Sequence, residues 1–552
     1  MTRNDPEVQH AGVKIDAEPL AELPVDRDGL VLEPWLGTLV RCYPERPRTI
    51  VELLDRAVAR FPERCCLVTP EGTVSYREFA ELVEGAAARL RAEGLTPGDC
   101  IAVCLRNGLE IAVAIWACAR AGVILVALNT RLRARQWAYM LAHSGARIAL
   151  AHPEFLAELR SAAAEAGLAP RAVRPMGDRL LGLRLAWDPR ASFPDEDATY
   201  AVIYTSGTTG RPKASRVVHR CTIHSAIAYL RTLALTGEDR SAITFPLFYI
   251  TAHIAQIAPL MLVGGVCVTV AEFEASAYVR LLVEQRITYL MVVPSVWPLL
   301  LRQPAFCAAE LSHVTVGAFG GSPMPRASVD ALRVRMPQLR LFDAYGMTET
   351  HSPATILLDH EFRRKPGSVG RPLPTCDARI ISDNGSVLAP NEPGELELRG
   401  PMITPGYYGD DTATATAIID GWLRTGDLAR IDAEGYVYLL DRKKDVITRG
   451  GFKVYSLELE YLLLAHPAIE QAAVVGLPDR TGYEQVAAVI VPAPGRTITR
   501  REIRRHVADH MASYAVPHQI RIVTELPRNR TGKVVKTELR ESLLRDLERD
   551  ER

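Results

Sequence analysis

The sequence lacks several patterns that would assign it to a simpler class of protein. Its ten cysteines are scattered and form no Cys-x-x-Cys pair, which argues against zinc ligands and against a disulfide framework. Lys and Arg together number 65, and Asp and Glu also number 65, so the formal net charge is zero. This balance argues against a protein built mainly to bind nucleic acid. We therefore expect no nucleic-acid partner, and we interpret the thiols as core residues.

The sequence also lacks an apolar secretory segment and an unbroken membrane span. Its N-terminus is polar and acidic, which favours a cytoplasmic location. Residues 242–271 contain no Asp, Glu, Lys or Arg, and this stretch is long enough to cross a bilayer. Pro246, Pro259 and the Gly264–Gly265 pair interrupt it, so the prediction is a buried helix, a turn and a strand.

What the sequence does contain is an alternation of helical and strand patterns. "TIVELLDRAVARF" has apolar residues at helical spacing, and Thr49 stands where it would cap a helix. "CIAVCL", "GVILVAL" and "RIALA" are typical of buried strands separated by helices. The alternation predicts an α/β fold whose parallel sheets are covered by helices on both faces.

A chain of 552 residues is too long for one core, so several domains are expected. We expect a loosely ordered tail at residues 1–30 and a large N-terminal domain at residues 31–440. That domain would contain two βα-layered subdomains and a small β-barrel-like part, since the stretch before residue 441 is rich in turns and strand-like. Residues 441–552 show a compact pattern that is long enough to fold as a small α+β domain. The charged joint at Arg442–Lys444 suits a hinge that lets this domain move.

The stretch "YTSGTTGRPKAS" (residues 204–215) indicates a phosphate-binding loop. Its glycines allow backbone amides to converge on anionic oxygens, and its hydroxyls add donors. It is not a Walker A loop, because Arg211 and Pro212 separate the last glycine from Lys213. An ordinary flexible surface loop is the alternative.

Four further stretches help to decide between a phosphate-binding loop and an ordinary surface loop. They are "AYGMTET" (344–350), "RTGDLA" (424–429), "DRKKDVITRGGFKVYSLELE" (441–460) and "PRNRTGKVVKTEL" (527–539). Each is weak alone. Together, in this order and at these separations, the five stretches resemble the adenylate-forming superfamily of acyl- and aryl-CoA ligases, nonribosomal adenylation domains and luciferases. The resemblance covers nearly the whole chain from Leu32.

The resemblance implies a nucleotide site. The loop after Tyr204 would hold the β- and γ-phosphates of ATP, with Lys213 adding charge. Tyr345 would stack on adenine, and Asp427, assisted by Arg442, would accept from the ribose hydroxyls. As alternatives, Lys213 is merely solvated and Tyr345 only fills the core. The other residues assigned to the nucleotide and coenzyme A sites are Thr205, Ser206, Gly207, Thr208, Thr209, Gly210, Gly320, Gly321, Ser322, Ala344, Gly346, Met347, Gly450, Gly451 and Phe452.

The resemblance also assigns the chemistry. Thr348 would contact the α-phosphate, and Glu349 would hold Mg2+ through its carboxylate. Lys533 would bridge the attacking carboxylate and the phosphate, where negative charge accumulates. The small domain would then swing about Lys444 and bring the Gly450–Gly451–Phe452 turn to the site for coenzyme A.

The acyl site departs from the common pattern. Many family members carry His in the motif that reads "FPLFYITAH" here, whereas this chain has Phe248 and Tyr249. This aromatic pair either gates an apolar or aryl pocket or packs against the sheet. We assign His253 and Gly317 to the same pocket. No Asp stands where α-amino-acid adenylating members hold the ammonium, which argues against an amino-acid substrate.

These features predict an acyl-CoA synthetase that uses ATP, Mg2+ and coenzyme A to activate a small carboxylic acid. Three alternatives remain within the enzyme class: transfer to an acyl-carrier protein, transfer to an amine, and activation of a non-acyl acid such as nitrite. A non-catalytic nucleotide-binding scaffold is the alternative from another class, and the presence of both Glu349 and Lys533 argues against it.

Overall fold

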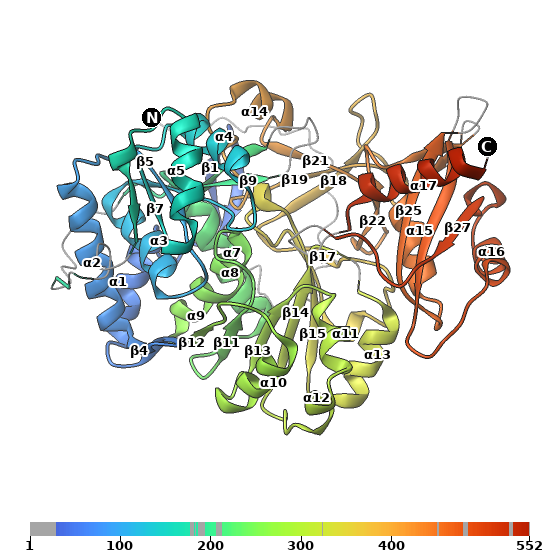
Figure 1. Ribbon diagram of the computed structural model, residues 1–552, viewed down its shortest axis with the longest axis horizontal. Coiled ribbons are helices and arrows are strands. Elements are labelled where there is room, and N and C mark those ends of the chain that lie inside the picture. Colours follow the sequence, from blue (N-terminus) through green and yellow to red (C-terminus); the bar gives the residue numbers. More distant parts are fainter. Residues whose placement is uncertain are drawn as a thin grey trace, which may run out of the picture.

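The computed structural model describes residues 29–176, 182, 184–185, 194–205, 212–322, 324–449, 452–478, 484–528 and 534–550. Two βα layers lie side by side, with a smaller sheet beside them and the C-terminal residues at the opposite end from the N-terminal layer (Figure 1). No helix in the described part of the chain is both long and apolar enough to span a membrane.

The first layer is a six-stranded sheet. Its strands are parallel except for the edge pair β9–β10, which is antiparallel. The three apolar runs predicted to be buried strands are β5, β6 and β7, so that prediction is confirmed. In spatial order the strands are β10 (Lys213–Val218), β9 (Thr199–Thr205), β6 (Ile124–Ala127), β5 (Cys100–Cys104), β7 (Ile148–Ala151) and β8 (Val173–Pro175).

The second layer is a nine-stranded sheet, parallel in its middle and antiparallel at both ends. Glycine or proline lies close to several strand ends, as expected for turns. In spatial order the strands are β17 (Arg371–Pro372), β16 (Thr355–Leu357), β15 (Arg340–Tyr345), β14 (Val316–Gly320), β13 (Tyr289–Val292), β11 (Arg240–Ile243), β12 (Val266–Thr269), β3 (Cys65–Thr69) and β4 (Gly72–Ser75).

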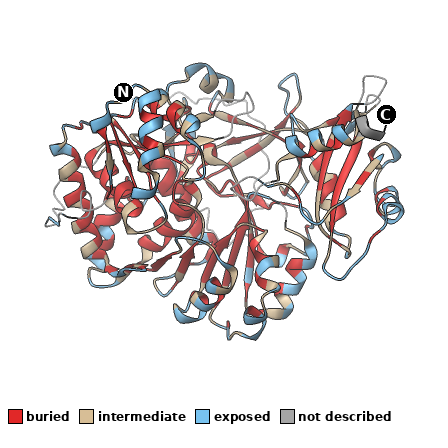
Figure 2. Ribbon diagram, viewed as in Figure 1, coloured by how far each residue is buried: buried red, intermediate tan, exposed pale blue. Residues whose placement is uncertain are grey.

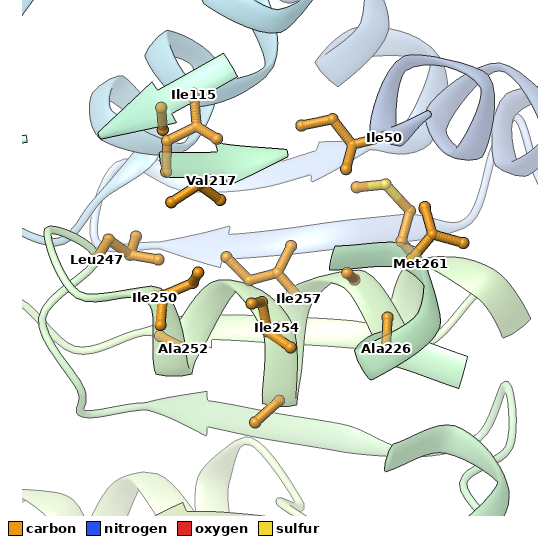
Figure 3. Packing of buried hydrophobic residues seen from close by; sticks show 14 of the residues in the cluster. Ile50, Ile115, Val217, Ala226, Leu247, Ile250, Ala252, Ile254, Ile257 and Met261 are labelled. Atoms are coloured by element: carbon orange, nitrogen blue, oxygen red, sulfur yellow. The ribbon is translucent and has the colours of Figure 1, made fainter. Parts of the chain in front are cut away.

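Helices fill the space between these two sheets and form the largest hydrophobic core among the described residues (Figure 2). Ile50, Ile115 and Met261 belong to this core and come from three different helices (Figure 3). Thr49 accepts a hydrogen bond from the Glu52 N–H, which confirms its predicted role as a helix cap. The helices are α1 (Ile50–Arg60), α2 (Tyr76–Ala92), α3 (Leu109–Ala121), α7 (His219–Leu233), α8 (Ile250–Ala252) and α9 (Ala258–Val263), with a π-helical turn at His253–Ile257.

The uncharged stretch of residues 242–271 belongs to this core. It contributes α8, the π-helical turn, α9 and all of β12, so the prediction of a buried helix, a turn and a strand is confirmed. Helices on the outer faces complete both layers. They are α4 (Ala134–Ser144), α5 (Leu156–Glu165), α10 (Ala275–Glu284), α11 (Val296–Leu301), α12 (Pro304–Ala308) and α13 (Arg326–Arg335).

A five-stranded antiparallel sheet lies beside the two layers, where the sequence predicts a small barrel-like part. Its last strand leads directly into the charged joint. The strands are β18 (Asp377–Ile381), β19 (Gly394–Arg399), β20 (Ile418–Ile419), β21 (Trp422–Ile431) and β22 (Val437–Arg442), and α14 (Asp411–Ala417) precedes β20. A separate hairpin near the N-terminus consists of β1 (Val31–Trp35) and β2 (Thr38–Cys42).

Beyond Arg442 the chain packs around apolar clusters of its own. Its contacts with the rest include an ion pair of 2.6 Å between Arg302 and Glu470. The elements are β23 (Ile447–Arg449), β24 (Phe452–Val454), α15 (Ser456–Leu464), β25 (Ile469–Pro478), β26 (Glu484–Pro492), α16 (Arg500–Ala508), β27 (Gln519–Ile522) and α17 (Lys536–Asp550). The boundary at residue 441 stays a prediction.

Candidate active site

The predicted phosphate loop is flanked by two paired strands. Thr205 ends β9 and Lys213 begins β10, and the two residues face each other in the antiparallel ladder. The chain therefore leaves and re-enters the sheet at one point. Ala214 lies in extended backbone of β10, so positive φ is not needed there. The predicted contacts of Ser206, Gly207, Thr208, Thr209 and Gly210 lie outside the described residues.

Glu349 is buried at 6% exposure in the 3-10 turn Thr348–Thr350, which follows β15. The Tyr407 hydroxyl donates a hydrogen bond to Glu349 Oε1 at 3.0 Å, and the Thr404 N–H donates to the Glu349 carbonyl at 2.8 Å. The Lys213 ammonium lies 4.9 Å from the Tyr407 ring centroid. A cation, an aromatic hydroxyl and the predicted metal ligand are thus brought together from three distant segments.

This carboxylate fits the predicted magnesium ion. Mg2+ in nucleotide sites takes one or two protein carboxylates and otherwise binds phosphates and water. Among the described residues no group of three or more His, Cys, Asp and Glu forms a cage for a metal. A single carboxylate held by Tyr407, near the Lys213 that follows the predicted phosphate loop, matches the donors that a nucleotide-bound Mg2+ takes from protein.

A second cluster links the predicted adenine and ribose residues. The Tyr345 hydroxyl donates to Asp427 Oδ2 at 2.7 Å, and Arg442 Nε lies 2.8 Å from Asp427 Oδ1. Burial, followed by the charge of Asp427, raises the pKa of Tyr345 well above its ordinary value, so the phenol stays protonated. Asp427 and Arg442 are cross-strand partners in β21 and β22, which fixes their distance.

The glycine-rich segment after β14 lies beside the end of β15. Gly320 pairs with Ala344, and a Cβ at Gly320 would lie 2.2 Å from the Ala344 carbonyl oxygen, so only glycine fits. Gly321 has φ +85° and is exposed, as is Ser322. Parallel α/β sheets bind ligands at the carboxyl ends of their strands. Gly346 and Met347 continue from the same end of β15.

His351 follows the motif in an unusual conformation. It has φ 47°, the left-handed region that is uncommon for residues other than glycine, and its side chain is fully buried. Burial lowers its pKa to about 3, so the ring is neutral. Non-glycine residues in this conformation cluster at functional sites. Sequence reasoning did not single out His351, and no sequence signal marks its conformation.

The predicted acyl pocket is only partly assembled from the residues assigned to it. Phe248 is buried, with its ring centroid 4.7 Å from that of Tyr249. The half-buried Tyr249 accepts a hydrogen bond of 2.9 Å from Asn129 Nδ2. Phe248 therefore packs in the core, and Tyr249 is the member of the pair that stays a candidate for contact with substrate.

His253 and Gly317 contact two different apolar cores, and their assignment to the acyl pocket stays a prediction. The His253 ring lies 4.7 Å from the Trp116 ring in the core between the sheets, and burial lowers its pKa to about 3. A Cβ on Gly317 would touch Trp297, Leu339 and Leu341 in the outer core. The reason is the alternation of a strand, which turns Gly317 to the face opposite that of its neighbours.

The C-terminal candidates are described in part. Phe452 is 57% exposed and stacks in parallel on Tyr514, with ring centroids 4.7 Å apart. Lys444 is exposed in the turn that follows β22. The predicted roles of Gly450, Gly451 and Lys533 lie outside the described residues.

Tyr407 is a second functional candidate that sequence reasoning missed. It lies 58 positions from Glu349, in "TPGYYGDD", which is typical of an ordinary turn. An aromatic pair next to glycine was the one available signal, and it does not reveal a partner so far away in the sequence.

Comparison with known proteins identifies the family. The model of the AMP-binding enzyme family matches residues 54–408, and that of the AMP-binding enzyme C-terminal domain matches residues 458–533. The chain is 32% identical over 501 residues to indoleacetate–CoA ligase of Aromatoleum aromaticum, covering 90% of this chain and 98% of the relative. It is 33% identical over 496 residues to feruloyl-CoA synthase of an Amycolatopsis species, covering 88% and 99%.

A similar protein has been solved with an acyl-adenylate, and also with ATP and magnesium ion. The o-succinylbenzoate CoA synthetase of Bacillus subtilis in complex with its acyl-adenylate intermediate superimposes with a TM-score of 0.78 at 28% identity, covering 90% of this chain and 98% of that one. The same enzyme has been solved with ATP and magnesium ion, with a TM-score of 0.78 at 29% identity and coverage of 88% and 98%.

The chain belongs to the AMP-binding enzyme family. The predicted superfamily and the predicted α/β fold, with a large N-terminal and a small C-terminal domain, are both confirmed.

Proposed function

We propose that this chain is an acid–thiol ligase that converts a carboxylic acid and ATP into an acyl-adenylate and then transfers the acyl group to coenzyme A. The family and the relatives named as CoA ligases confirm this class of enzyme, with ATP, Mg2+ and coenzyme A as its cofactors. Coenzyme A is the acceptor we propose, rather than an acyl-carrier protein, because these relatives carry it in their names. The cytoplasm stays the predicted location.

The observation that carries the proposal is the arrangement around Glu349. Adenylation brings a carboxylate against a polyanion, so positive charge must be fixed near the phosphates. Lys213 supplies a cation at the edge of the loop, and Tyr407 holds Glu349 in one orientation. Mg2+, when bound, would neutralise phosphate charge, with Glu349 as its protein ligand. Thr348 stands next to Glu349 for the proposed contact with the α-phosphate.

The second cluster would hold the nucleoside. Asp427 is buried, accepts a hydrogen bond from the Tyr345 hydroxyl and pairs with Arg442, so its carboxylate can receive ribose hydroxyls without reorientation. Tyr345 is fixed through its hydroxyl, which leaves its ring face as the proposed adenine contact. Lys533 is the proposed cation for the phosphoryl step, and Lys444 is the proposed pivot.

For the substrate we propose an acid that carries a ring. Two relatives are named for indoleacetate and ferulate, and a third for 2-succinylbenzoate. Tyr249 presents an aromatic side chain where many members carry His, and no Asp stands nearby to hold an ammonium group. The absence of that carboxylate from the sequence supports a substrate without an α-amino group.

One screen tests the proposal. Pyrophosphate and AMP release should be measured across aryl, arylalkyl and fatty acids, with and without coenzyme A. We expect release with at least one ring-bearing acid, and an acyl-CoA product only when coenzyme A is present. Adenylation without any thioester would overturn the proposed acceptor, and activity restricted to straight-chain acids would overturn the proposed substrate class.

Lys533→Ala separates the two half-reactions. We expect it to abolish adenylate formation and to spare thioester formation from a supplied acyl-adenylate, because the lysine acts only on the phosphoryl step. Equal loss of both half-reactions would contradict this role.

A further inference from the structure

A buried polar network joins three segments that are far apart in the sequence. Asp441 stands near the end of β22, Ser456 begins α15 and Lys536 begins α17. The Ser456 N–H donates to Asp441 Oδ2, and the Ser456 hydroxyl donates to Oδ1 at 3.0 Å. Lys536 Nζ donates to the Ser456 hydroxyl at 2.7 Å and forms an ion pair of 2.8 Å with Glu460 Oε1.

This network is buried and charged. Asp441 is 2% exposed, Ser456 is fully buried, and Glu460 is 7% exposed. Burial disfavours the charged form of Lys536, yet Glu460 and Asp441 outweigh it and raise its pKa above the ordinary value. Lys536 itself is half-buried, and because two buried carboxylates depend on its charge, its side chain has little freedom to leave this position.

The backbone beside Lys536 is also held. The Val535 N–H donates to the Pro527 carbonyl at 2.9 Å, and Val534 forms a β-bridge with Arg528. The chain that enters α17 is thus anchored by backbone bonds and by one side chain. Lys533 precedes Lys536 by three positions in the sequence.

We propose that Lys536 is a positioning residue for adenylation: its contacts with Glu460 and Ser456 fix the start of α17 and thereby the placement of the segment that carries the catalytic lysine. This inference rests on the proposed function. Ser456 extends the anchor to Asp441, so the start of α17 is tied to a strand on the N-terminal side of the proposed pivot Lys444. Lys536 acts through the position of Lys533 and does not touch substrate.

The test distinguishes a misplaced catalytic lysine from a destabilised protein. Lys536→Met alone leaves two carboxylates buried without their cation, so it is paired with Glu460→Gln, which keeps the acceptor for the Val474 N–H. Because misplacement of a catalytic group costs rate rather than binding, we expect the double variant to lower the kcat of adenylation by about tenfold or more. The KM for ATP should change by less than about twofold, as should thioesterification of a supplied acyl-adenylate. Lys536→Arg should restore most of the adenylation rate.

Substitutions at Ser456 provide an independent test of the same proposal. Ser456→Ala removes the hydroxyl that joins Asp441 to Lys536, and Ser456→Thr retains it. We expect slower adenylation from the alanine variant and nearly parental adenylation from the threonine variant, with thioesterification unchanged in both. Circular dichroism and thermal unfolding should first establish that each variant is folded.

Two outcomes would overturn the proposal. One is an adenylation rate in the folded double variant equal to that of the parent. The other is an equal fall in both half-reactions, which would indicate a general structural role. Failure of the proposed function is distinguishable, because the parent itself would then release no pyrophosphate with any acid.

Discussion

Tyr407→Phe isolates one hydrogen bond at the proposed magnesium site. The substitution removes the hydroxyl that donates to Glu349 Oε1 at 3.0 Å and keeps the ring over which the Lys213 ammonium lies. A hydrogen bond to a charged group contributes about 1.5–3 kcal/mol. Losing a group that orients a metal ligand costs about 10–100-fold in metal affinity or activity, which is the same range. Glu349 remains as a ligand, so the effect should fall short of that of Glu349→Gln.

The assay is pyrophosphate release at fixed ATP and acid while the Mg2+ concentration is varied. We expect the Mg2+ concentration for half-maximal rate to rise by about tenfold or more in Tyr407→Phe. For Glu349→Gln we expect a further rise and a loss of rate of roughly two orders of magnitude. Tyr408→Phe is the matched control, because the neighbouring hydroxyl contacts the Cys100 thiol and not Glu349.

The refuting result is an unchanged Mg2+ dependence in Tyr407→Phe with the protein folded. It would mean that Tyr407 does not orient a metal ligand and that the hydrogen bond only stabilises the fold. A parallel loss in Tyr408→Phe would point to the same conclusion.

Three further changes test other parts of the molecule. Gly320→Ala places a methyl group against the Ala344 carbonyl oxygen, so we expect a loss of about 1–3 kcal/mol in the free energy of unfolding and a higher KM for ATP. Unaltered urea unfolding would show that β14 and β15 can separate without cost. Burial raises the pKa of Asp343 to about 8, whereas an unfolded Asp titrates near about 4. The folded state therefore holds the proton more tightly, and its stability should fall as pH rises from about 4 to about 8. Asp343→Asn should flatten this decline, and equal slopes of melting temperature against pH in parent and variant would contradict the assignment. Lys444→Pro fixes φ near about −65°, so a folded variant should keep pyrophosphate release and lose most acyl-CoA formation, whereas Lys444→Ala should keep both. Parental acyl-CoA formation by Lys444→Pro would show that no rotation about this residue is needed.

Local patterns in the sequence predicted the elements that depend on local physics. Thr49 caps its helix, and the three apolar runs form neighbouring strands of one sheet, because capping and strand burial are decided within a few residues. The uncharged stretch at residues 242–271 lies in the core for the same reason: its prolines and glycines break it into short elements. The resemblance to a family then assigned Glu349, Tyr345 and Asp427 to one site, and this assignment stays a prediction.

The remaining features depend on contacts between distant segments. The partner of Glu349 comes from a turn 58 positions away, and no pattern within either segment points to the other. His253 was assigned by its motif, and its ring lies 4.7 Å from that of Trp116 in the core. Gly317 was assigned by its place in a glycine-rich stretch, and the alternation of β14 turns it toward Trp297. The contact of either residue with substrate stays a prediction.

The ladder between β21 and β22 determines where the C-terminal part can begin to turn. Arg442 is the last residue of β22 and faces Asp427, and the Lys443 N–H still donates to the Gly426 carbonyl at 2.9 Å. The chain up to Lys443 is therefore clamped to the sheet that carries Asp427. Lys444 is the first position beyond the clamp, so its proposed role as pivot rests on hydrogen-bond register and not on any special flexibility of lysine. A residue inserted between Asp441 and Lys444 would shift Lys444 by one position relative to the last hydrogen bond of the ladder, even if every side chain of the site were retained.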